Sequence, residues 1–350
     1  MSIDFGSEQR AANRAGQAFI NHVRAALHDL PGEPSPDARL DVDRLNSSVF
    51  RLRRRATGAT ESVVVKRLTA AVAERNELVL GRWLPDLGLA HAAPALLGTV
   101  TSQSSAFVWQ LYEDLGTNVL DGRNPDPRAV GAAVELVAEL HTRAAGAALL
   151  AECSCHLGDR GIRYFVSNVD DTTNGLEALD ALAAAFTPEQ RFVRDRLLER
   201  LRTLRESVPV RTRVIQGVGG PPTLLHGDLW DINTLVVATS ECVQARFIDW
   251  DRAGVGPIAY DLSTFLYRFA PNERTWILQQ YRDCVGRAGW RLPDPSDLNV
   301  LFDTAECARY ANRITWPATA LLAEGGEAEH RELADILGWF DALAPVLAEG

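Results

Sequence analysis

Three polar side chains follow two short apolar segments in the second half of the chain. Asp228 lies in the stretch His226-Gly227-Asp228-Leu229-Trp230-Asp231-Ile232-Asn233, and Asn233 follows it after five positions. Asp249 comes 16 positions later, at the end of a second apolar segment. Carboxylate and amide oxygens are the ligands that Mg²⁺ takes from proteins, and phosphate oxygens complete its shell. A carboxylate that does not bind the metal can orient a hydroxyl group and accept its proton.

A plainer interpretation stays open for this set, because turns between strands also carry Asp, Asn and Gly for their backbone preferences. Lys66 adds to the chemical interpretation, since it ends the apolar strand Ser62-Val63-Val64-Val65-Lys66. A lysine at the end of a strand can also extend its ammonium into solvent without any function.

The elements that must position these residues change in character along the chain. Alternating apolar residues predict strands at 40–45, 49–55, 62–68, 96–101 and 107–111, and helical spacing predicts helices at 7–29 and 70–84. We therefore expect an α+β fold that begins with a small antiparallel sheet and one inserted helix. Beyond residue 118 the pattern predicts mostly helices, at 127–146, 174–185, 187–207, 258–270, 273–288, 296–313 and 329–347. The segment 150–175 is predicted to be a lid or a surface loop.

Length and charge limit the function classes. A chain of 350 residues favours two lobes, and its net charge of −10 argues against nucleic acid as a partner. The N-terminal segment lacks a secretory pattern, and no apolar run reaches the roughly 18 residues that a membrane span needs. We expect a cytoplasmic enzyme with no membrane partner, active as a monomer or homodimer.

The two polar motifs together resemble a known family. The stretch HGDLWDIN followed by IDWDRAGVGPIAYDL is similar to the signature of the aminoglycoside phosphotransferase and choline kinase superfamily. The resemblance implies a bilobed protein-kinase-like fold and transfer of a γ-phosphate from ATP or GTP to a hydroxyl group. It implies that Asp228 is the catalytic residue and that Asn233 and Asp249 bind Mg²⁺.

The same resemblance assigns the nucleotide-binding residues of the small lobe. Lys66 would contact the α- and β-phosphates, with Glu77 as its ion-pair partner and Glu74 as a rival. Ser47 and Ser48 would lie in the loop that covers the phosphates, although this loop lacks the glycine-rich pattern.

The resemblance also divides the chain and places the nucleobase. It implies an N-terminal lobe over 1–112, a hinge over 113–118 and a helical C-terminal lobe over 119–350. Backbone groups at Gln110 and Tyr112 would face the base, an arrangement that does not distinguish ATP from GTP.

The acceptor is the least determined part. Acidic and aromatic side chains of the large lobe would suit a small cationic molecule, such as an aminoglycoside-like antibiotic or an amino alcohol. The candidates are Asp159, Asp170, Asp171, Glu324, Glu327, Glu329, Trp230, Trp316 and Tyr310.

The alternatives within enzymes are a sugar or fructosamine-type kinase and a homoserine-type kinase. An alternative of another class is a pseudokinase that binds nucleotide without turnover. A protein kinase is disfavoured because no activation segment follows Asp249.

Overall fold

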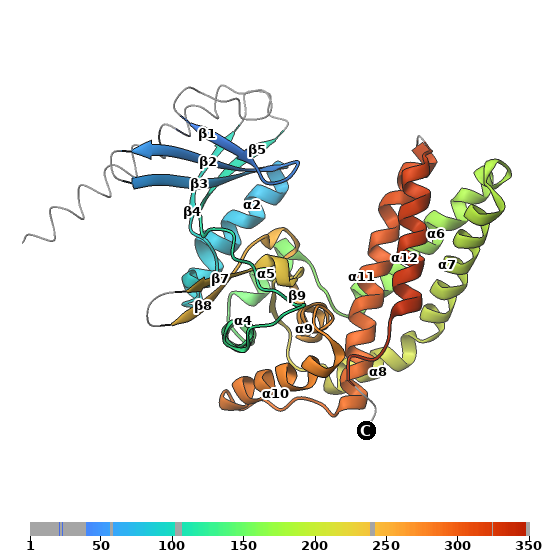
Figure 1. Ribbon diagram of the computed structural model, residues 1–350. Helices are drawn as coiled ribbons and strands as arrows, with labels where there is room; N and C mark the ends of the chain where they lie inside the picture. Colours follow the sequence, from blue (N-terminus) through green and yellow to red (C-terminus); the bar gives the residue numbers. More distant parts are fainter. Residues whose placement is uncertain are drawn as a thin grey trace, which may run out of the picture. The chain divides into compact units, whose positions relative to one another are not determined.

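The computed structural model describes residues 21, 23, 40–56, 59–101, 107–238, 242–323 and 325–347. These residues form two compact units (Figure 1). The first takes the chain up to Asn118 together with Arg246–Asp251, and the second takes Val119–Ala245 and the chain from Arg252 onward. Most of the helix predicted at 7–29 lies outside the described residues.

The first unit is built on a five-stranded sheet in the order β1-β2-β3-β5-β4, and all its strand pairs are antiparallel. The strands are β1 (Asp41–Arg44), β2 (Val49–Ala56), β3 (Ala59–Leu68), β4 (Leu96–Thr101) and β5 (Val108–Glu113). The central strands are the most buried, and five consecutive residues of β5 are buried. Phe50, Val65 and Trp109 belong to the apolar core of this unit. The predicted strands and the α+β class are confirmed.

One helical segment follows β3 and was predicted as a single helix over 70–84. It consists of α2 (Ala70–Leu78), a π-helical turn (Val79–Trp83) and α3 (Leu84–Asp86). Its buried residues include Ala73, Asn76, Val79 and Trp83. The buried face of α2 therefore includes an amide side chain, that of Asn76.

The second unit is mainly helical. Its helices are α4 (Pro127–Ala144), α5 (Leu150–Leu157), α6 (Ile162–Ala178), α7 (Pro188–Glu206), α8 (Val208–Val218), α9 (Ala259–Leu266), α10 (Pro271–Arg287), α11 (Pro295–Ala323) and α12 (Glu327–Ala342). The largest apolar cluster lies among α6, α7, α11 and α12, which run side by side in Figure 1. Phe165, Leu201 and Ile336 are among its fully buried members.

Two predictions about the helices were wrong in detail. The segment 150–175, predicted as a lid or surface loop, forms α5 and most of α6, and Phe165 lies in the apolar core. The helix predicted to end near residue 313 continues through Pro317 to Ala323.

Short strands hold the polar loops. β6 (Thr223–Leu225) pairs with β9 (Gly254–Gly256), and β7 (Thr234–Ala238) pairs with β8 (Val243–Phe247). The loop with Asp228 therefore runs from β6 to β7, and the segment with Asp249 runs from β8 to β9.

Among the described residues, no helix is both long and apolar enough to cross a bilayer.

Candidate active site

Asp228 lies in the second unit, on a loop whose backbone shape depends on the glycine before it. Gly227 has a φ of +82°, a region that residues with a side chain rarely adopt. A Cβ atom at this position would lie 1.9 Å from the carbonyl oxygen of Arg252. Any side chain at position 227 would therefore force the loop away from the β9 segment.

The buried carboxylate of Asp261 braces the same loop. Its two oxygens accept hydrogen bonds from the backbone N–H groups of His226 and Gly227, each at 2.8 Å. His141 Nε2 lies 3.4 Å from Asp261 Oδ2, and His141 Nδ1 lies 2.8 Å from the hydroxyl of Tyr281. Burial alone would raise the pKa of Asp261, but His141 and the Gly227 N–H outweigh burial and hold the pKa below its ordinary value.

Asp261→Asn tests this bracing. We expect the free energy of unfolding at neutral pH to fall by roughly 2–3 kcal/mol, since two hydrogen bonds to a buried charged group are weakened. The folded-state pKa of Asp261 is lowered, so its stabilisation is complete above the ordinary value of 3.8 and is lost as the pH falls through the folded-state value. Denaturant titrations should show a constant difference between the proteins from about pH 5 to 8 and a shrinking one in acid. A difference that grows toward acid would contradict the assignment.

Asn233 lies on the same loop as Asp228 and is bonded to it. Asn233 Nδ2 donates to the Asp228 carbonyl oxygen at 2.9 Å and lies 3.5 Å from Asp228 Oδ2. A short 3₁₀ helix, Asp231–Asn233, provides the turn that brings the two residues together. That Asn233 binds a cation through its amide oxygen stays a prediction.

The other half of the predicted set lies in the first unit. Lys66 Nζ lies 2.5 Å from Asp249 Oδ1 and 2.7 Å from Asp251 Oδ2. Burial alone would lower the pKa of Lys66, but the charges of the two aspartates outweigh burial and raise it. Asp251 lies two positions after Asp249 in the same motif, and the sequence did not predict its contact with Lys66.

Asp249 has an unusual backbone conformation. Its φ is +66°, and among the described residues other than glycine no other φ is positive. Such strain often marks functional sites, because the surrounding structure must maintain it.

Carboxylates that converge on a cation are the donor set that Mg²⁺ requires. Asp249 and Asp251 already place oxygens around one positive charge, the Lys66 ammonium. The described residues contain no group of three His, Cys, Asp or Glu side chains that could hold a metal ion. A magnesium ion at Asp249 therefore needs further oxygens, which nucleotide phosphates supply.

The predicted partner of Lys66 on the following helix is not what the structure shows. Glu77 is exposed and accepts a hydrogen bond from Thr99, and Glu74 is exposed as well. Asn76, which is only 2% exposed, faces the cluster instead, and its Nδ2 lies 3.0 Å from Asp251 Oδ1. One residue along a helix turns the side chain by about 100°, so α2 points an amide inward and its glutamates outward.

The loop between β1 and β2, which carries Ser47 and Ser48, is closed by a neighbouring side chain. Asn46 Oδ1 accepts from the backbone N–H groups of Ser48 and Val49 at 2.8 and 2.9 Å. Ser47 is exposed and Ser48 is half-buried. A contact of these serines with phosphates stays a prediction.

Gln110 and Tyr112 lie inside β5, which is paired on both sides. In the ladder Gln110 is opposite Lys66 and Thr99, and Tyr112 is opposite Val64 and Leu96. The Gln110 side chain donates to the carbonyl oxygen of Ala73 and accepts from the Tyr112 hydroxyl. The described contacts of both side chains are therefore structural, and nucleobase binding at these two residues stays a prediction.

The acidic residues predicted to bind an acceptor are mostly engaged by other groups of the chain. Asp159 accepts from the Gly161 N–H, Asp170 pairs with Arg205 at 3.3 Å, and Glu327 accepts from Gln190. Asp171 and Glu329 lie on α6 and α12, and Glu324 lies outside the described residues.

Of the three aromatic candidates, one lies on the same loop as Asp228. Trp230 follows Asp228 by two positions, and the Arg268 guanidinium lies 4.1 Å from the centroid of its ring. Tyr310 packs against Trp339 and Phe340, and Trp316 is 64% exposed.

A cation near Asp228 was missed because α11 carries no motif that marks it. Arg309 pairs with the buried Glu306 and donates to the carbonyl oxygen of Tyr260 at 2.9 Å. Burial would lower the pKa of Arg309, but the charges around it, Glu306 first and Asp228 among them, raise it. The electrostatic environment of Asp228 therefore includes a permanent positive charge.

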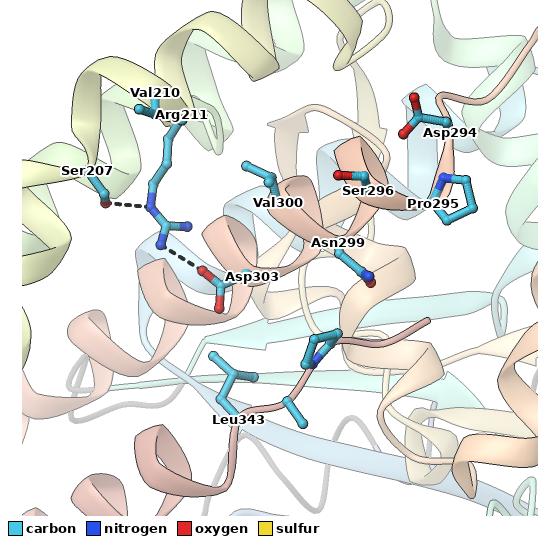
Figure 2. A pocket seen from close by; sticks show the side chains of 12 residues that line it. Ser207, Val210, Arg211, Asp294, Pro295, Ser296, Asn299, Val300, Asp303 and Leu343 are labelled. Carbon is cyan, nitrogen blue, oxygen red and sulfur yellow. Dashed lines mark hydrogen bonds and ion pairs between the residues drawn. The ribbon is translucent and has the colours of Figure 1, made fainter. Parts of the chain in front are cut away.

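A cavity of about 870 Å³ lies elsewhere in the second unit, between α8, the start of α11 and the C-terminal segment (Figure 2). Two of its charged side chains pair with each other, since Arg211 lies 2.7 Å from Asp303, and Arg211 also donates to Ser207. None of the predicted site residues lines this cavity.

The fold has counterparts among solved structures. A spectinomycin phosphotransferase, solved with ADP and spectinomycin, matches with a TM-score of 0.55 at 13% identity, over 88% of this chain and 90% of that one. An ethanolamine kinase from Plasmodium vivax matches with a TM-score of 0.55 at 13% identity, over 86% and 82%. An aminoglycoside 2′-phosphotransferase, solved with GDP, matches with a TM-score of 0.52 at 13% identity, over 89% and 92%. At this identity the similarity shows the fold alone, which is protein-kinase-like, as predicted.

The sequence assigns the chain further. The family model described as "Phosphotransferase enzyme family" matches residues 38–295, which is most of the chain. The protein therefore belongs to this family, and the predicted enzyme class, a small-molecule phosphotransferase, is confirmed. No curated protein matches the chain in sequence.

Proposed function

We propose that this enzyme transfers the γ-phosphate of ATP or GTP to a hydroxyl group of a small molecule. One arrangement carries the proposal above all: the oxygens of Asp249 and Asp251 converge on the ammonium of Lys66. Such a cluster offers an ammonium to phosphate oxygens and carboxylates to a metal ion, and a metal–triphosphate complex needs both.

The proposed roles follow from the chemistry of each side chain. Asp228 orients the acceptor hydroxyl and receives its proton late in the transfer. Lys66 neutralises charge on the α- and β-phosphates. Asn233 and Asp249 would hold Mg²⁺, which when bound neutralises charge on the β- and γ-phosphates.

The nucleobase of the phosphate donor and the identity of the acceptor molecule are also part of this proposal. The solved relatives hold ADP in one case and GDP in another, so both nucleotides are candidates here. A cationic acceptor is supported by the net charge of −10. Sugar, fructosamine-type and homoserine-type acceptors remain the alternatives. We further propose a cytoplasmic enzyme, monomeric or homodimeric, without nucleic acid or membrane partners.

A screen of acceptors tests the proposal. The protein is incubated with Mg²⁺ and ATP or GTP over aminoglycosides, amino alcohols, sugars and hydroxy amino acids, and nucleoside diphosphate release is measured. We expect release above background with at least one acceptor class, and mass spectrometry should find the phosphorylated product. Nucleotide binding without transfer to any acceptor would favour the pseudokinase alternative, and absence of nucleotide binding would overturn both.

A further inference from the structure

The cluster around Lys66 contains a carboxylate with a second, separate anchor. One oxygen of Asp251 lies 2.7 Å from Lys66 Nζ, and the other lies 3.0 Å from Asn76 Nδ2. The Lys66 and Asp251 side chains are 15% and 25% exposed. Asn76 is 2% exposed, so the carboxylate is held from the protein interior on one side and holds the lysine on the other.

The surroundings of Asn76 explain why this position carries an amide and not an acid. Besides Asp251, its Nδ2 faces Gln110 Oε1 at 3.4 Å and the Tyr112 hydroxyl oxygen at 3.3 Å. The Tyr112 hydroxyl donates to Gln110 Oε1 at 2.6 Å, so the groups that face Asn76 are acceptors. A carboxylate at position 76 would lose the donor that Asn76 offers to Asp251 and would repel Asp251 instead.

The two glutamates of α2 do not contact Lys66 in place of Asp251. Glu77 accepts from Thr99, and Glu74 is exposed, so neither supplies the carboxylate that Lys66 meets. Only Asp249 and Asp251 supply that charge among the described residues, and the proposed function assigns Asp249 to the metal ion.

We propose that Asp251 is the positioning residue for Lys66 and replaces a helix glutamate in that role. This inference rests on the proposed function. If Asp249 held the metal ion, Asp251 would remain as the counter-charge of Lys66, and a shielded ammonium needs one. Asp251, fixed by Asn76, keeps the ammonium where it can meet the phosphates.

Nucleotide binding without an acceptor tests the inference. The affinity of the full chain for ADP and ATP with Mg²⁺ is measured by calorimetry for the wild type and for Asp251→Asn. We expect roughly tenfold weaker binding, the loss of one charge-assisted hydrogen bond. Asp251→Glu, which keeps the charge, should lie closer to the wild type. Glu77→Gln, the matched acid-to-amide control, should bind as the wild type does.

A double-mutant cycle separates positioning from direct contact. In a Lys66→Met background, Asp251→Asn should weaken binding little further, because its effect passes through the lysine. An equal loss in both backgrounds would make Asp251 a metal or phosphate contact and overturn the inference. So would an Asp251→Asn variant that is folded by circular dichroism and binds as the wild type does. Absence of nucleotide binding by the wild type would instead refute the proposed function.

Discussion

Asp228→Ala should lower turnover by roughly two to four orders of magnitude while nucleotide affinity changes no more than a few-fold. The proposed role explains this split. Asp228 acts on the acceptor hydroxyl, whereas the nucleotide is held by other groups. The measurement is kcat with an acceptor from the screen, beside a calorimetric affinity for the nucleotide.

The control for Asp228→Ala lies on the same loop. Asp231 accepts from the backbone N–H groups of Gly122 and Ile232, so Asp231→Asn removes a charge nearby without touching the proposed chemistry. It should keep turnover within a few-fold of the wild type. Near-normal turnover of Asp228→Ala would show that the catalytic assignment is wrong.

Asp249→Asn should lower kcat/KM by at least roughly a hundredfold, since a metal ion contributes several kcal/mol to the transition state. Asparagine is the informative substitution because it tolerates the positive φ of +66° and removes the charge alone. The dependence of rate on Mg²⁺ concentration should shift to higher concentrations.

Asp249→Ala serves as the comparison for Asp249→Asn, because alanine removes the charge and adds backbone strain. It should therefore be less stable in thermal unfolding than Asp249→Asn. If Asp249→Asn keeps the Mg²⁺ dependence of the wild type and Asp251→Asn shifts it, the metal ligand is residue 251.

The loop of Asp228 and Asn233 could be predicted from the sequence, because its polar residues lie close together along the chain. Asp228 and Asn233 are five positions apart on one loop, and the structure joins them by a hydrogen bond. The strand that ends in Lys66 was recognisable for the same reason.

The ion-pair partner of Lys66 could not be predicted from the sequence. It depends on which face of α2 packs inward and on a segment far along the chain. Asn76 and Glu77 are neighbours in sequence, and only the packing of α2 decides which faces the sheet. Asp251 follows Lys66 by 185 positions, so no local pattern joins them.

One helical segment was not predicted and one helix end was placed too early, for different physical reasons. The polar residues of 150–175 obscured an amphipathic pattern whose buried face includes Phe165 and Leu176. The helix predicted over 296–313 continues past Pro317 to Ala323, because the buried residues Ile314, Ala318 and Leu321 outweigh the helix-breaking preference of proline.

The Asn46 side chain that closes the loop of Ser47 and Ser48 has a thermodynamic consequence. A glycine-rich loop has many backbone conformations and loses that entropy when a ligand orders it. Here two backbone amides are already held by one side-chain oxygen, so folding itself has removed part of this freedom. A ligand that contacts such a preorganised turn meets a smaller entropic penalty than a glycine-rich turn would impose.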